Sequence, residues 1–216
     1  VILDGQTYSD GVDLVPDEIY RVYREKNILP KTAAINTAEY MEFFKQFTDQ
    51  GYEVVHLTLG SGLSATYNNC RLAAAEMPGV YAVDSRSLST GSGLAVLEAA
   101  DRIAAGMPAE QVAREVQELT ARCHASFAHH ARARAAAPWV RRKSPPRCGS
   151  SIIRRRGGRC SALAMLGANL LQLKPCIEVN PADGSMNVGK KYRGSLDKAL
   201  SQYVRDKLEG CADLKT

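Results

Sequence analysis

The chain has 216 residues, of which 45% are hydrophobic and 24% are charged, a composition typical of a folded globular protein and not of an intrinsically disordered one. No apolar run reaches the ~18 residues that a membrane-spanning helix needs, and the N-terminus lacks the basic and apolar segments of a secretion signal. We therefore expect a cytoplasmic protein with no membrane span. Its six cysteines are expected to be reduced thiols, because they form no closely spaced pair of the zinc-binding kind.

The first half of the chain alternates between helical and strand-like patterns. In five segments apolar residues recur at helical spacing, and several of these segments begin at a capping residue or proline and end at glycine. The predicted helices are residues 17–27, 36–51, 64–79, 90–106 and 108–123. The apolar runs 52–59 and 80–84 are typical of buried strands. This alternation predicts an α/β protein whose mostly parallel sheet is covered by helices.

The predicted helix at 36–51 is the most strongly patterned of the five. Asn36 or Thr37 is its expected N-cap, and Gly51 its terminator. Its aromatic residues recur at helical spacing, and they are Tyr40, Phe43, Phe44 and Phe47. We expect this aromatic stripe to pack in the core.

The pattern changes near residue 124. Residues 124–156 show no sustained periodicity and place three prolines and the only tryptophan among arginines. Order returns with a helical pattern over 161–173, and then with two short strands joined by a turn at Asp183-Gly184. An amphipathic helix with Ser195 as its N-cap follows.

The charge distribution marks the same region. The formal net charge of the chain is only +5, yet residues 119–177 hold twelve Arg and Lys and no Asp or Glu. Pattern and charge together divide the chain into three parts. These are a first α/β lobe over 1–123, an irregular Arg-rich segment over 124–156 and a partial second α/β lobe over 157–216.

Small and hydroxyl-bearing side chains fill residues 60–67, between a predicted strand and the helix after it. In open α/β sheets, ligands bind at such strand-to-helix turns. Small side chains let backbone N–H groups approach a ligand, and the N–H groups at a helix N-terminus favour an anion. The turn is therefore a candidate anion site, although a helix cap without a ligand has the same sequence features.

Two known motifs, one for phosphate binding and one for nucleophilic catalysis, do not fit this turn. A Walker-type loop ends in Gly-Lys-Ser/Thr, and the turn has no lysine. Around Ser64, a nucleophile elbow would need glycine at the position of Thr66, and none of the four histidines has an evident acidic partner. Nucleoside triphosphate binding and serine-hydrolase chemistry are therefore disfavoured at this turn.

Several segments resemble motifs of one protein family, in that family's order. LGSGLSATYNN at 59–69 resembles its Ser-Ser-x-Leu-Ser-Gly-Thr-Tyr signature. Further matches are VILDGQTYSDGVDL at 1–14, PKTAAINTAEYMEFF at 30–44, YAVDSRSLSTGSGL at 81–94, GGRCSALAMLGANLLQLKPCIEV at 157–179 and GKKYRG at 189–194. The chain is thereby similar to the DegV family of bacterial fatty-acid-binding proteins over residues 1–122 and 157–216.

The resemblance implies a two-lobed α/β fold that holds a long-chain fatty acid with its carboxylate near the lobe interface. It implies that hydroxyls, backbone N–H groups and one guanidinium hold the carboxylate, through charge-assisted hydrogen bonds that offset the cost of burial. The residues at the matching positions are Thr32, Ser61, Ser64, Ala65 and Arg159. It further implies a binding protein rather than an enzyme, with no catalytic residue, metal site or cofactor. The fatty acid would be presented to the catalytic subunit of a fatty acid kinase for phospholipid synthesis. The family's first strand and C-terminal part have no match here, so we expect the fold to be incomplete at both termini.

Other interpretations stay open at this point. The Arg-rich residues 128–156 are consistent with an out-of-frame translation of a GC-rich gene, which we favour, with a disordered insertion, or with a nucleic-acid-binding site. Nucleic acid is the least favoured partner, because few aromatic residues interleave the arginines. An enzyme acting on a small acyl or phosphorylated substrate, with Ser64 or Asp84 in a catalytic role, is the alternative function. The simpler interpretation of Asp84 and Ser85 is a cap and turn after a strand.

Overall fold

The computed structural model describes residues 1–9, 11–128 and 173–209. The chain forms two compact units. The first comprises residues 1–33, 128–175 and 191–216, and the second comprises residues 34–127 and 176–190. Within the described ranges no helix is both long and apolar enough to cross a lipid bilayer. The division of the chain at 124–156 stays a prediction, because most of that segment lies outside the described residues.

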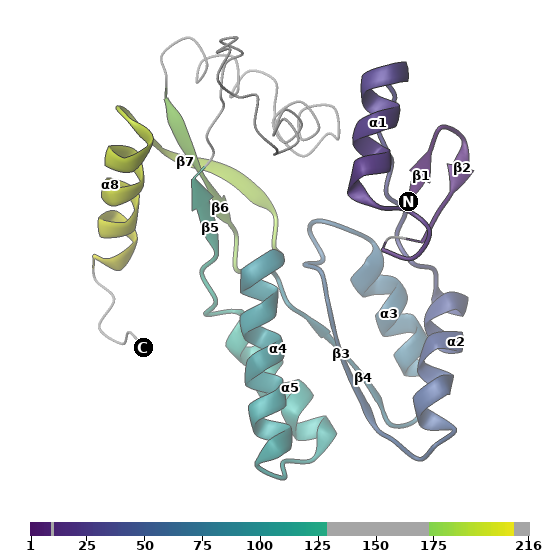
Figure 1. The fold of residues 1–216 in the computed structure, drawn as a ribbon. Helices are drawn as coiled ribbons and strands as arrows, with labels where there is room; N and C mark the ends of the chain where they lie inside the picture. The colour runs from purple at the N-terminus through teal and green to yellow at the C-terminus, as the bar shows by residue number, and fades with distance from the viewer. Residues whose placement is uncertain (10, 129–172, 210–216) are drawn as a thin grey trace. The chain divides into compact units, whose positions relative to one another are not determined.

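The first unit begins with a short antiparallel hairpin of β1 (Ile2–Leu3) and β2 (Gln6–Thr7) (Figure 1). Asp4 and Gly5 form its turn with positive φ angles of 50° and 81°, as a type I′ turn requires. Lys31 also pairs with β1, exchanging backbone hydrogen bonds of 2.7 and 2.8 Å with Ile2. The segment just before Thr32 is thereby tied to the start of the chain.

Two helices of the first unit have clear end signals. Helix α1 (Pro16–Lys26) starts at a proline and stops where Asn27 takes the left-handed conformation, and its Val22 packs in a small core with Leu3 and Leu14. Helix α8 (Leu196–Leu208) begins after Ser195, whose Oγ accepts a 3.3 Å hydrogen bond from the Lys198 N–H. The predicted Ser195 cap is confirmed.

The second unit is built around two parallel strands. Strand β3 (Val54–Thr58) pairs with β4 (Val80–Asp84), with Thr58 opposite Asp84 at the carboxyl end. Alternate side chains point to opposite faces of a strand, and here both faces are apolar. Val54, Val80 and Ala82 pack on one face, whereas Val55, Leu57, Tyr81 and Val83 pack on the other. Such continuous apolar runs are what strands covered on both faces require.

Four helices cover these two faces (Figure 1). They are α2 (Thr37–Thr48), α3 (Thr66–Ala75), α4 (Ser89–Ala104) and α5 (Ala109–Thr120). Helices α2 and α3 pack on one face through Tyr40, Phe44 and Cys70. Helices α4 and α5 pack on the other through Ala95, Val112 and Val116. The predicted α/β class is confirmed, and all four helices lie where the apolar periodicity places them.

A second sheet has the strand order β5-β6-β7, from β5 (Ser126–Ala128), β6 (Lys174–Val179) and β7 (Met186–Tyr192). Residues 180–185 connect β6 to β7, with Gly184 at a φ of 82°. The predicted pair of strands joined at Asp183-Gly184 is therefore present. The helix predicted at 161–173 lies almost wholly outside the described residues.

The expectation for the aromatic stripe of α2 is half wrong. Phe44 and Tyr40 are buried, but Phe43 and Phe47 are 45% and 39% exposed. The buried face of α2 is centred between Tyr40 and Phe44, so Phe43 and Phe47 lie to one side of its centre, towards the border of that face. Phe43 still makes edge contacts with Phe44 and Phe47, at ring-centroid distances of 5.9 and 5.4 Å.

Candidate functional site

Three loops of the second unit converge at the carboxyl edge of β3 and β4. Residues 60–65, which we call the hydroxyl turn, connect β3 to α3, and residues 85–88 connect β4 to α4. The third loop is the β6–β7 turn. The Gly60 N–H donates to the Ser87 carbonyl over 2.9 Å, and the Gly62 N–H donates to the Asp183 carbonyl over 2.6 Å. Because the parallel strands β3 and β4 end at the same edge, the hydroxyl turn and the β4–α4 loop meet here. The β6–β7 turn, which belongs to the other sheet, packs against the hydroxyl turn.

The glycines of the hydroxyl turn serve this close packing. A Cβ atom at Gly60 would lie 3.0 Å from the Ser87 nitrogen, and one at Gly62 would lie 2.9 Å from the Asp183 oxygen. Their N–H groups are already bound to neighbouring loops, so they are not the ligand donors that small side chains suggest. Glycine at these two positions allows neighbouring loops to pack closely, and it does not give a ligand access to the backbone.

Asp84 lies at the centre of this edge and is only 5% exposed. Its Oδ1 accepts hydrogen bonds from two backbone N–H groups, that of Ser61 at 3.1 Å and that of Arg86 at 2.8 Å. The side-chain amide of Gln117 on α5 makes two hydrogen bonds with the Asp84 backbone. Its Oε1 accepts from the Asp84 N–H at 2.9 Å, and its Nε2 donates to the Asp84 carbonyl at 3.2 Å. The carboxylate thus bridges the hydroxyl turn and the β4–α4 loop from a fixed position.

Ser64 closes the start of α3. Its Oγ accepts a 3.2 Å hydrogen bond from the Thr66 N–H and lies 2.7 Å from the Thr66 hydroxyl. Ala65 occupies the N-cap position and has no side-chain oxygen to cap the helix. The next N–H groups, those of Tyr67 and Asn68, have no acceptor within the helix because they belong to its first turn. The positive end of α3 and the hydroxyls of Ser64 and Thr66 therefore lie together.

The sequence-predicted site residues fall in different parts of the structure. Ser61, Ser64 and Ala65 lie on the hydroxyl turn in the second unit, whereas Thr32 belongs to the first unit. The Ser61 Oγ is exposed and lies 3.5 Å from the Asp183 carbonyl. Arg159 lies outside the described residues, as does nearly all of the Arg-rich segment. The joint role of these five residues stays a prediction.

The β4–α4 loop carries a second set of hydroxyl groups that sequence reasoning did not assign to a site. The Ser85 Oγ lies 2.9 Å from the Ser92 Oγ and donates to the Ser87 carbonyl at 3.2 Å. Ser85 and Ser87 are fully buried, which favours a structural role. The interpretation of Asp84 and Ser85 as cap and turn agrees with this geometry, but the bridge from Asp84 to Ser61 was missed. Its signal was the position of Asp84, at the end of the strand parallel to β3.

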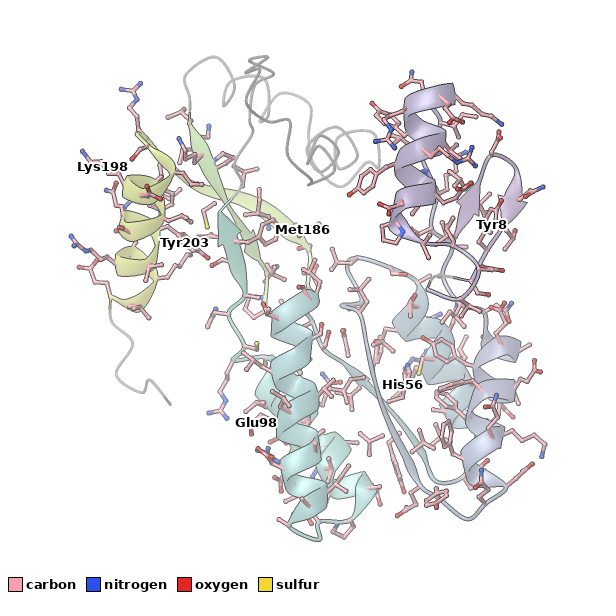
Figure 2. The ribbon with its side chains drawn as sticks, viewed as in Figure 1. Tyr8, His56, Glu98, Met186, Lys198 and Tyr203 are labelled. Carbon is pink, nitrogen blue, oxygen red and sulfur yellow. The ribbon has the colours of Figure 1, made fainter. Side chains whose placement is uncertain are left out.

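His56 and Cys70 of the second unit are committed to packing. His56 of β3 lies against Tyr40 and Phe44, at ring-centroid distances of 5.3 and 5.2 Å, and burial lowers its pKa (Figure 2). Burial also raises the pKa of the Cys70 thiol to about 12, so this cysteine is a protonated core residue. No group of three His, Cys, Asp or Glu side chains that could hold a metal ion occurs among the described residues.

The fold and this edge define an α/β protein with a hydroxyl-rich turn leading into a helix N-terminus. Comparison with known proteins then gives the family. A model of the DegV family, whose members are described as uncharacterised proteins, matches residues 1–131, which is more than half of the chain. The chain belongs to the DegV family, and the predicted resemblance is confirmed.

Relatives and solved structures agree with this assignment. A DegV domain-containing protein of Clostridium perfringens is 28% identical over 192 residues, which make up 88% of this chain and 61% of that protein. Another, from Mycobacterium bovis, is 32% identical over 194 residues, or 89% of this chain and 60% of that protein. The chain thus spans about three fifths of the length of these relatives. A structure described as showing fatty acid binding by a DegV family protein of Thermus thermophilus has a TM-score of 0.71 and 27% identity, covering 96% of this chain and 68% of that one.

Proposed function

We propose that this chain binds a long-chain fatty acid and that the hydroxyl turn receives its carboxylate. The observation that carries the proposal is the start of α3, where the Ser64 hydroxyl lies beside N–H groups that have no acceptor within the helix. Such a helix terminus attracts an anion, and a carboxylate needs several donors to leave water. The fatty acid binding of the similar Thermus thermophilus protein identifies the class of anion.

The geometry of the hydroxyl turn supports separate parts for Ser61 and Ala65. The Ser61 N–H donates to Asp84, so Ser61 would act through its exposed hydroxyl. Ala65 has no side-chain donor, so its part would be played by the backbone N–H groups near it at the start of α3. Thr32 and Arg159 enter the proposal through the family resemblance.

Affinity and orientation come from different parts of the ligand. Burial of the acyl chain contributes about 0.8 kcal/mol per methylene, so a chain of about 16 carbons supplies most of the binding free energy. The hydroxyls and N–H groups fix which end of the ligand is at the turn. The protein would then act as a carrier without chemistry of its own, presenting the carboxylate to a fatty acid kinase. Formation of acyl phosphate on addition of such a kinase and ATP is the test of that partnership.

Mass spectrometry tests fatty acid binding directly. Purified protein from a lipid-replete bacterial host, analysed under denaturing conditions, should release close to one equivalent of a long-chain fatty acid. Ser64→Ala should weaken palmitate binding about tenfold, the effect of losing one hydrogen bond to a charged group. Ser9→Ala, which removes an exposed hydroxyl of the first unit, is the matched control and should bind as the parent does. Absence of any bound fatty acid in the parent protein would overturn the proposal.

A further inference from the structure

Three consecutive N–H groups of the hydroxyl turn are bound to three different parts of the second unit. Gly60 donates to the Ser87 carbonyl, Ser61 to the Asp84 carboxylate, and Gly62 to the Asp183 carbonyl. Two of these acceptors are backbone groups, which no substitution removes. Asp84 is the one acceptor of the three that is a side chain.

Asp84 is well placed to hold the turn. The two hydrogen bonds to Gln117 fix its backbone to α5, and its carboxylate also holds the Arg86 N–H, with Arg86 in the left-handed region at a φ of 47°. A non-glycine residue adopts this conformation at a cost, so the Arg86 N–H bond holds a loop that would otherwise relax. One oxygen atom, Oδ1 of Asp84, therefore binds both loops at this edge.

We propose that Asp84 is a positioning residue for the bound carboxylate. It would act through the Ser61 N–H, holding the hydroxyl turn so that Ser64 and the first turn of α3 face the ligand. This inference rests on the proposed fatty acid binding. Its physical basis is preorganisation, because a turn that is already ordered loses less conformational freedom when the ligand binds.

If Asp84 positions the turn, its loss should weaken fatty acid binding. The negative charge of Asp84, taken alone, predicts the opposite effect. A buried carboxylate near a bound anion repels it, so removal of the charge without loss of positioning should strengthen fatty acid binding. Asp84→Asn and Asp84→Ala both remove the charge. Only Asp84→Asn keeps an oxygen atom that can accept the Ser61 N–H. The two variants therefore separate charge from position.

The test is displacement of a fluorescent fatty acid from the full chain by palmitate and by 1-hexadecanol, which has the same chain length and no charge. Asp84→Ala should raise the Kd for palmitate about tenfold, whereas Asp84→Asn should lower it or leave it within about threefold of the parent's value. Neither variant should change the Kd for hexadecanol by more than about twofold. Asp101→Asn, at an exposed position of α4, is the control and should match the parent with both ligands.

The outcomes separate the two levels of the proposal. If the parent protein fails to bind palmitate, the proposed function is wrong. If the parent binds palmitate, the positioning role is overturned by equal effects of Asp84→Ala and Asp84→Asn, or by equal losses for palmitate and hexadecanol. Thermal unfolding of each variant is measured first. If Asp84→Ala is unfolded at the assay temperature, Ser61→Pro is compared with Ser61→Ala instead, because both lack the Ser61 hydroxyl and only Ser61→Pro lacks the N–H that binds Asp84. A palmitate-selective loss in Ser61→Pro beyond that in Ser61→Ala is then the supporting result, and equal losses overturn the positioning role.

Discussion

The Gly62 N–H donates a 2.6 Å hydrogen bond to the carbonyl of Asp183, which lies far along the chain on the β6–β7 turn. Gly184, the next residue, approaches the Gly60 Cα so closely that a Cβ atom on Gly184 would lie 3.0 Å from it. The hydroxyl turn is therefore completed by a segment that follows the Arg-rich region. The first 123 residues do not by themselves contain the whole of this edge.

Gly62→Ala should destabilise the second unit by about 1–3 kcal/mol, because its Cβ would lie 2.9 Å from the Asp183 oxygen and the two turns would have to separate. Thermal or urea unfolding measures this loss. Gly93→Ala is the matched control, since a Cβ there meets nothing within 4 Å and Gly93 lies within α4. It should stabilise the protein by about 0.5–1 kcal/mol. Equal effects of the two substitutions would contradict the close packing of the turns.

The elements of this fold could be predicted from the sequence because their signals are local. Helices α2 to α5 and strands β3 and β4 follow from apolar periodicity and end signals, and the β6–β7 turn follows from Asp183-Gly184. The hairpin of β1 and β2 has an equally local signal in Asp4-Gly5, which the sequence reasoning did not use. The bounds of these elements differ from the predicted bounds by one or a few residues, which is usual because helix ends fray.

Phe44→Ala should lower the free energy of unfolding by about 3–5 kcal/mol, since Phe44 is fully buried between α2 and the strands. Phe43→Ala, one residue earlier and 45% exposed, should cost no more than about 1 kcal/mol. Chemical denaturation of both variants compares the two positions. A similar loss at Phe43 would show that its ring is covered in the protein in solution.

The site was harder to predict than the fold, for a physical reason. Hydroxyl and glycine residues after a strand indicate a close approach of backbone, but not which group approaches. Here the Gly60 and Gly62 N–H groups bind other loops of the protein, and the partner of the Ser61 N–H is a carboxylate on a different strand. Pairings between loops depend on the sheet register, in which Thr58 is opposite Asp84, and no local pattern encodes that register.

His56 should make stability depend on pH. Burial among Tyr40 and Phe44 lowers its pKa below the ordinary value of 6.5, so the unfolded chain binds a proton more readily than the folded one. The stabilisation from neutral His56 is fully present above pH ~6.5 and is lost as the pH falls below that value, at up to about 1.4 kcal/mol per pH unit.

Urea unfolding of the parent and of His56→Leu between pH 5 and 8 tests this dependence. The difference in unfolding free energy between the two proteins should be constant above pH ~6.5 and should shift in favour of His56→Leu below it. Taking the difference removes the contribution of carboxylates, which titrate at lower pH and are common to both proteins. A difference that is flat across the whole range would show that His56 is solvated in the folded protein.

Asn36 and Glu39 form a reciprocal cap at the start of α2. The Asn36 Oδ1 accepts from the Glu39 N–H at 2.9 Å, and the Glu39 Oε2 accepts from the Asn36 N–H at 2.9 Å. Asn36→Ala should cost about 1 kcal/mol of stability, and Asn36→Asp, which keeps the acceptor, much less. Because the two hydrogen bonds close one ring of interactions, Asn36→Ala and Glu39→Ala should be non-additive in a double-mutant cycle read by thermal unfolding. Strict additivity would mean that the two side chains cap the helix independently of each other.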